Sequence, residues 1–222
     1  MRIFLAALIL LGASPGAIAE PSAADRSRIE QAYARRLAEQ QQQDVDQRIA
    51  ARAEALNQSP ASPVLGNPAG DVVIVEFFDY ACPYCKAVEP RLEALLKFDR
   101  KVKLVLKEFP ILTPQSMIAS RAALASVAQG KYKPFHQAMM NFRGQLLEPD
   151  IFEMAKASGL DLVRLRRDMT APAISDEIIA NFNLARGIRA FQTPVFIVGN
   201  HVMSSESASI DFPRAVAVAR GR

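Results

Sequence analysis

The stretch Phe77-Phe78-Asp79-Tyr80-Ala81-Cys82-Pro83-Tyr84-Cys85-Lys86 contains both cysteines of this 222-residue chain, and only two residues separate them. A disulfide across so short a ring would stabilise the fold by only about 2 kcal/mol, because it closes a very small loop of the unfolded chain. A structural zinc site normally needs four ligands, and the two histidines, His136 and His201, lie far away in the sequence. These observations favour a redox-active pair over a structural disulfide or a metal site.

The residues on either side of the pair predict a strand, a turn and a helix. Residues 72–78 are short, almost entirely apolar and rich in β-branched and aromatic side chains, which is typical of a strand covered on both faces. Pro83 is favoured at the first position of a helix, and residues 83–98 carry apolar side chains at helical spacing. Cys82 is then expected near the N-cap, where unpaired N–H groups and the helix dipole stabilise a thiolate. Cys85, one turn inside the helix, is expected to be less exposed and to resolve a mixed disulfide.

The rest of the chain continues an α/β pattern. A second strand is predicted over residues 102–109, followed by a helical, alanine-rich block over about 114–187 that is broken at three glycines. Residues 193–198 and 201–203 flank a Gly-Asn pair, which predicts a β-hairpin. Residues 210–220 can form a closing helix.

The N-terminal part of the chain differs in composition from the remainder. Residues 1–19 have the pattern of a cleavable secretory signal, so we expect the mature protein in an oxidising extracytoplasmic compartment. Residues 20–62 are predicted to be a polar helical extension and linker, with one thin apolar stripe along residues 22–58. Such a stripe is expected either to dock loosely or to pair with copies of itself in a homo-oligomer. Residues 63–222 remain for the main domain.

The charge balance argues against a nucleic-acid partner. The formal net charge of +4 comes from 27 basic and 23 acidic residues, and the two signs are interspersed along the chain. We interpret His136 as a structural or surface residue, and His201 as an exposed one. Lys86 is interpreted as an exposed lysine of the first helical turn, with the alternative that it adds positive potential beside the cysteine pair.

Three segments of the chain resemble the DsbA-like thiol:disulfide oxidoreductases of bacterial envelopes, a family with the thioredoxin fold. These segments are residues 75–85, which hold the cysteine pair, residues 107–112 and residues 187–196. They occur in the order found in that family, with the helical block between the last two, and the resemblance covers about residues 64–220. It implies an α/β, thioredoxin-like fold with a helical insertion at about 114–187, here joined to an N-terminal helical extension.

The resemblance also implies roles for residues near the cysteines. Thr193 and Pro194, joined by a cis peptide bond, would lie opposite the pair and bind the substrate chain together with Pro83 and Tyr84. Glu76 is the one charged residue of its apolar strand. Either it is solvated at a rim, or, as in the family, it lies beneath the active site and relays the proton of the second cysteine.

Together these features predict a periplasmic protein thiol:disulfide oxidoreductase that acts on unfolded or misoxidised envelope proteins and is recycled by a membrane redox partner. Because electrons move between thiols, neither an organic cofactor nor a metal is expected. Pro83-Tyr84 stands where strongly oxidising members of the family carry Pro-His, which predicts a weaker oxidant. An oligomeric disulfide isomerase or reductase, kept reduced by a membrane partner, is one alternative. A Cu(I)-binding envelope protein that uses the two thiolates is another.

Overall fold

The structure, a computed structural model, describes residues 22–204 and 210–221. It contains two compact units, residues 1–41 and 42–222. The secretory signal predicted over residues 1–19 lies outside the described residues. None of the helices in the described ranges is long and apolar enough to cross a membrane.

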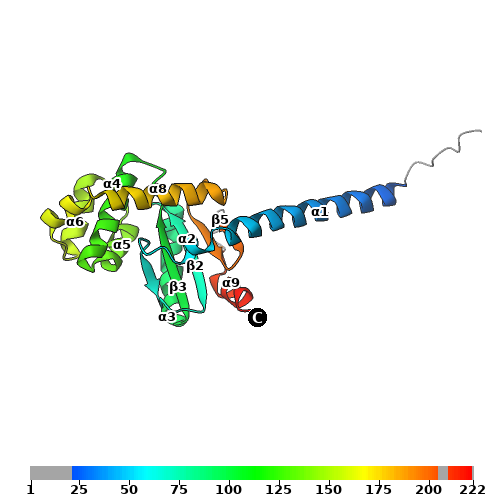
Figure 1. Ribbon diagram of the computed structural model, residues 1–222, viewed down its shortest axis with the longest axis horizontal. Coiled ribbons are helices and arrows are strands. Elements are labelled where there is room, and N and C mark those ends of the chain that lie inside the picture. Colours follow the sequence, from blue (N-terminus) through cyan, green and yellow to red (C-terminus); the bar gives the residue numbers. More distant parts are fainter. Residues whose placement is uncertain (1–21, 205–209, 222) are drawn as a thin grey trace, which may run out of the picture. The chain divides into compact units, whose positions relative to one another are not determined.

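The larger unit is built on a mixed sheet with the strand order β1-β3-β2-β4-β5 (Figure 1). The central strands β2 and β3 run parallel, and the other neighbouring strands pair antiparallel. The strands are β1 (Val64–Gly66), β2 (Val72–Phe78), β3 (Val102–Glu108), β4 (Val195–Val198) and β5 (His201–Ser204). The predictions of β2, β3 and the β4–β5 hairpin are confirmed. The short strand β1 was not predicted, because it ends at Gly66 inside a cluster of turn-forming residues.

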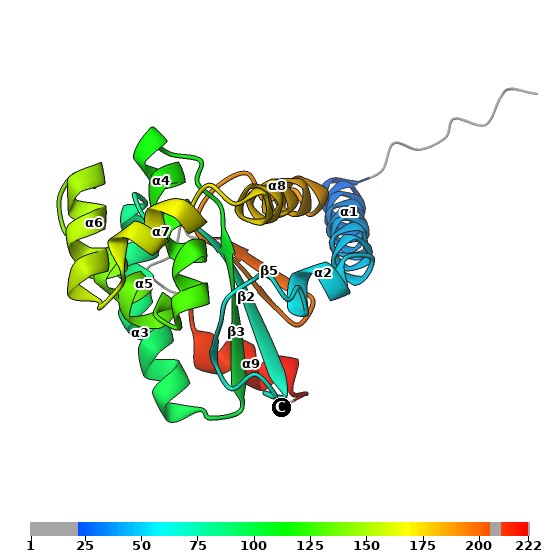
Figure 2. The same cartoon turned by 60° about the vertical axis from the view of Figure 1, so that its left-hand side comes forward.

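Helices cover both faces of the sheet, and most of them lie between β3 and β4 as the sequence predicted. The helix α3 connects β2 to β3, and α9 closes the chain (Figure 2). The helices of the insertion are α4 (Pro114–Ser126), α5 (Tyr132–Asn141), α6 (Glu148–Ala157), α7 (Leu162–Asp168) and α8 (Pro172–Gly187), and the other two are α3 (Pro83–Phe98) and α9 (Phe212–Ala219). Residues of α3, α4, α5, α6 and α9 share one apolar core with one face of the sheet.

The other face of the sheet is covered by α8 and by part of the N-terminal extension. The extension forms α1 (Ala23–Ala50) and α2 (Ala53–Asn57). Ile49 and Leu56 are buried in a second core with Phe77 and Val105 of the sheet and Leu184 of α8. The C-terminal half of the predicted stripe is therefore part of the main core, because an apolar sheet face needs a cover.

The N-terminal unit is described only as the first part of α1. Its apolar side chains Ile29, Tyr33 and Leu37 are 61%, 70% and 43% exposed. A helix with exposed apolar residues at this spacing has a face that can pack against another protein surface.

Candidate active site

The two cysteines lie at the N-terminus of α3, immediately after the turn at the end of β2. Cys82 is the N-cap residue and Pro83 the first helical residue, as predicted. The N–H of Cys85 donates to the sulfur of Cys82 at 3.4 Å. The Cys82 thiol donates to the backbone oxygen of Thr193 at 3.3 Å, and both sulfurs are present as free thiols. The Cys82 sulfur therefore lies at the N-terminal end of the helix, and the Cys85 sulfur lies about one turn further along it.

The surroundings push the acidities of the two thiols in opposite directions. Hydrogen bonds from the side chains of Cys85 and Thr193, together with the N–H groups of Cys85 and Tyr84, lower the pKa of Cys82 to about 6 despite its burial. Burial, the hydrogen bond to Cys82 and the charge of Glu76 raise the pKa of Cys85 well above its usual range. At neutral pH the pair therefore combines a nucleophilic thiolate with a thiol that must lose its proton before it can attack.

A groove of about 730 Å³ opens beside Cys82. Tyr84, Leu112 and Phe191 present large apolar side chains to solvent there, with exposed fractions of 61%, 48% and 69%. The residues that line the groove are Cys82, Pro83, Tyr84, Ile111, Leu112, Phe191, Gln192 and Thr193. The sequence analysis named Pro83, Tyr84 and Thr193 but not Ile111, Leu112 or Phe191, although their position next to the predicted strand ends could have indicated them.

The peptide bond between Thr193 and Pro194 is cis. Thr193 is 6% exposed and its backbone oxygen accepts the Cys82 thiol. This contact joins the loop before β4 to the start of α3. Pro194 immediately precedes β4 and is not among the residues that line the groove.

Asp79 accepts hydrogen bonds from several segments that surround the groove, a role that was not predicted from the sequence. Its Oδ2 atom accepts the N–H groups of Ile111 and Leu112 at 2.8 and 2.9 Å. Its Oδ1 atom accepts the N–H of Ala81 and the hydroxyl of Ser116, both at 2.7 Å. One buried carboxylate thus fixes the active-site turn, the loop after β3 and the start of α4 relative to one another.

Glu76 is fully buried in the central strand, so the alternative that it is solvated at a rim is wrong. It lies between Leu106 of β3 and Phe196 of β4 in the sheet register. Neither of its carboxyl oxygens has a hydrogen-bond partner among the described residues. Burial raises the pKa of Glu76 well above its usual range, and the charges of Glu89, Cys82 and Glu108 add to this effect.

The prediction that Lys86 is exposed is also wrong. Its side chain donates to the backbone oxygen of Phe142 at 2.8 Å, and the Phe142 ring centroid lies 5.6 Å from the ammonium nitrogen. The end of α5 therefore covers this lysine, and burial lowers its pKa. His136 is buried, so the alternative that it lies at the surface is wrong, and His201 is exposed as expected. In the described ranges, no group of three or more His, Cys, Asp or Glu side chains is arranged to hold a metal ion.

Comparison with known proteins agrees with this geometry. The family model for the DSBA-like thioredoxin domain matches residues 73–215. The chain belongs to this family. A thioredoxin-like oxidoreductase from Silicibacter pomeroyi DSS-3 is 40% identical, with a TM-score of 0.73 over 76% of this chain and 98% of that one. The thiol-disulfide exchange protein α-DsbA2 from Wolbachia pipientis is 25% identical, with a TM-score of 0.74 over 80% and 97%.

Curated relatives include both oxidoreductases and larger proteins. A Rickettsia typhi protein named as a protein-disulfide oxidoreductase is 25% identical over 67% of this chain and 57% of its own length. The Na(+)/H(+) antiporter NhaA 3 of Salinispora tropica is 28% identical over 61% of this chain, which spans only 21% of the antiporter. The chain thus shares the family and the thioredoxin-like fold, and it spans less than two thirds of the length of these curated relatives.

Proposed function

We propose that this DsbA-like chain is a thiol:disulfide oxidoreductase of the periplasm, in which Cys82 exchanges with substrate proteins and Cys85 resolves the mixed disulfide. The placement of the two cysteines carries the proposal: Cys82 is the N-cap residue of α3 and lines the groove, whereas Cys85 is fully buried one turn inside the helix. A thiolate at a helix N-terminus that lines a groove can attack or be attacked, whereas a thiol that lies away from the groove can react only within the protein.

The reaction in the reducing direction has two steps that balance. The Cys82 thiolate attacks a disulfide of the substrate, which forms a Cys82–substrate bond and releases one substrate thiolate. Cys85 then gives its proton to the ionised form of Glu76 and attacks the Cys82 sulfur, so that the Cys82–Cys85 disulfide forms and the second substrate thiolate leaves. Oxidation of a substrate dithiol is the reverse, and no organic cofactor or metal takes part in either direction.

The groove indicates the kind of substrate. Thr193 and Pro194, with Pro83 and Tyr84, would hold an extended polypeptide whose cysteine lies opposite Cys82. The exposed apolar side chains beside the pair suit unfolded or misoxidised envelope proteins, which present apolar residues that folded proteins bury. A membrane redox partner would return the pair to its starting state.

Trapping tests the two cysteine roles. In a Cys85→Ser variant the mixed disulfide on Cys82 cannot be resolved, so mass spectrometry should find a stable adduct with a cysteine-containing peptide. The matched Cys82→Ser variant should form none. Adducts that accumulate equally on Cys85 in the second variant would contradict the assignment.

An oligomeric isomerase or reductase is a second candidate, favoured by the exposed stripe of Ile29, Tyr33 and Leu37. Such a stripe would bury its apolar area by pairing with copies of itself. Light scattering of the mature chain should then report a dimer or trimer that becomes a monomer when the three residues are replaced by serine. If the mature chain and its serine variant are both monomers, the oligomeric isomerase or reductase is excluded and the oxidase is favoured.

A further inference from the structure

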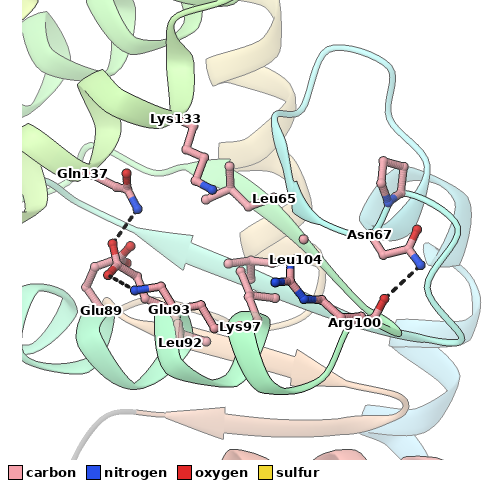
Figure 3. Close-up of a pocket in the computed structure, with 13 residues that line it drawn as sticks. Leu65, Asn67, Glu89, Leu92, Glu93, Lys97, Arg100, Leu104, Lys133 and Gln137 are labelled. Atoms are coloured by element: carbon pink, nitrogen blue, oxygen red, sulfur yellow. Dashed lines mark hydrogen bonds and ion pairs between the residues drawn. The ribbon is translucent and has the colours of Figure 1, made fainter.

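A cavity of about 350 Å³ lies between β1, α3 and α5, away from the cysteine pair (Figure 3). In Figure 3, Lys133 and Gln137 extend from α5 toward Glu89 and Glu93 of α3. Among the described residues, none lines both this cavity and the groove beside Cys82. The volume is in the range of sites that hold small molecules. The cavity can therefore hold a ligand that does not touch the substrate groove.

Glu89 brings a buried acid without a partner to this cavity. It is 2% exposed, and its Oε2 atom has no hydrogen-bond partner among the described residues. Its Oε1 atom lies 3.6 Å from Nε2 of His136, which is too far for a hydrogen bond. A buried carboxyl group without a partner is costly, and a bound ammonium group would supply both the missing donor and the opposite charge.

Glu93, one helical turn further along α3, also lines the cavity but already has partners. Its Oε1 atom accepts the side chain of Gln137 at 2.5 Å, and its Oε2 atom lies 3.9 Å from Nζ of Lys97. Of the two acids in the cavity wall, Glu89 therefore keeps the oxygen that a ligand can use.

Basic side chains line the part of the cavity that is remote from Glu89. They are Lys97, Arg100 and Lys133. An α-helix rises 1.5 Å per residue, so Lys97 lies about 12 Å beyond Glu89 along α3. Neither the Arg100 guanidinium nor the Lys133 ammonium group forms an ion pair within the described part of the chain. This end of the cavity therefore favours an anionic group.

The wall between the two charged ends is largely apolar. It contains the side chains of Leu65, Leu92, Leu96 and Leu104. A ligand stem made of methylene groups or short side chains would bury apolar surface against these leucines, which is favourable.

We propose that this cavity binds a small zwitterion, with the ligand's ammonium group on Glu89 and its carboxylate facing Arg100 and Lys133. The ammonium group donates to Oε2 of Glu89, and the stem packs against the leucines. A ligand with only one of the two charges would leave one end of the site unpaired. ω-Amino acids and short free peptides share this chemistry, since a dipeptide spans about 7 Å between its charged ends and the long basic side chains can reach back toward it. The site does not depend on the exchange reaction of the cysteines.

Isothermal titration calorimetry of the reduced protein with 6-aminohexanoate tests the proposal. We expect saturable binding with a Kd of about 1 mM or tighter, which is within reach of a ligand with nine non-hydrogen atoms. Hexylamine and hexanoate each lack one charged end, and they should bind about tenfold more weakly or worse. Alanyl-alanine separates the two sources, because tighter binding than 6-aminohexanoate identifies a peptide and weaker binding an ω-amino acid.

Variants test the two ends of the site. Glu89→Gln should weaken the binding of 6-aminohexanoate about tenfold or more, because it removes the charge from the acceptor of the ammonium group. The matched control Glu93→Gln should lose much less, since its carboxylate is already paired. Replacing the exposed Arg100 and Lys133 together with glutamine should also weaken binding, whereas Lys156→Gln, an exposed lysine of α6 outside the cavity, should not.

Nuclear magnetic resonance locates the ligand, and backbone shifts on adding 6-aminohexanoate should gather at Leu92, Leu96 and Gln137. Three results would overturn the proposal: no saturable binding, shifts that gather at Leu112 and Phe191 of the groove, or unchanged affinity in Glu89→Gln. If Glu89→Gln does not fold, equal affinity of the wild type for 6-aminohexanoate and hexanoate would overturn it instead. Cys82→Ser should bind as the wild type does, so a chain that binds the zwitterion but does not exchange disulfides would refute only the proposed function.

Discussion

Replacing Glu76 with leucine should stabilise the protein while it impairs the exchange reaction. Glu76 is fully buried, and neither of its oxygens is hydrogen-bonded within the described part of the chain. An unsatisfied buried polar group costs about 1–3 kcal/mol. Leucine has a similar size and would place methyl groups between Leu106 and Phe196. The free energy of unfolding should therefore rise by about 1–3 kcal/mol even at a pH where the carboxyl group is protonated in both states.

The stabilisation should grow as the pH rises. Burial, Glu89, Cys82 and Glu108 raise the pKa of Glu76 in the folded state, whereas the unfolded chain ionises near the usual value of 4.5. Above that pH the unfolded state releases a proton that the folded state keeps, so the wild type loses stability at up to about 1.4 kcal/mol per pH unit until the folded carboxyl group ionises as well. The leucine variant has no such group, and its advantage over the wild type widens accordingly.

Urea unfolding of both reduced proteins between about pH 4 and pH 7 measures the difference in their free energies of unfolding. Circular dichroism is the probe, because the chain has no tryptophan for a fluorescence assay. Glu93→Leu is a matched control on a partly exposed glutamate that Gln137 already satisfies, and it should not stabilise the fold. A Glu76→Leu protein that is less stable than the wild type, or whose advantage stays constant between pH 4 and pH 7, would refute the reasoning.

Further predictions concern the nucleophile, the groove wall and the extension. The rate of Cys82 alkylation should rise with pH with a midpoint near pH 6. Its pKa of about 6 makes Cys82 about 90% thiolate at pH 7, against about 3% for a free cysteine. A midpoint above pH 8 would contradict this prediction. Asp79→Ala should lower the free energy of unfolding by about 3 kcal/mol or more, because it leaves the N–H groups of Ile111 and Leu112 and the active-site turn without their acceptor. It should also raise KM for peptide substrates, and Asp79→Asn, which keeps one acceptor oxygen, should lose less on both measures. Deleting residues 1–41 should leave the urea midpoint unchanged, because residues 42–222 form a compact unit of their own.

The sequence predicted the elements whose signals are local. The apolar run of β2 and the proline at the start of α3 gave their bounds directly, since a buried strand and a helix N-terminus each have a strong signature over a few residues. The stripe of the extension was visible, but a stripe indicates only that one face of a helix is apolar and not what covers it. That Ile49 and Leu56 cover the sheet beside Phe77 depends on long-range packing, which no local pattern contains.

The candidate site was predictable to a similar degree. Cys82 and Cys85 were identified by their spacing, and the N-cap position of Cys82 was indicated by Pro83. In the sequence Asp79 has only the features of an ordinary turn residue. Its hydrogen bond to the loop after β3 depends on the folded structure, which brings that loop next to it. Lys86 was assigned to solvent because nothing in its neighbourhood along the chain shows that the end of α5 covers it.

Equilibration of the purified mature protein with glutathione redox buffers tests the central claim most directly. The account predicts one reversible transition, in which the Cys82–Cys85 pair passes from dithiol to disulfide and the mass falls by that of two hydrogen atoms. The midpoint of that transition then separates an oxidase from an isomerase or reductase. A pair that keeps the same state at every ratio of reduced to oxidised glutathione would contradict the account.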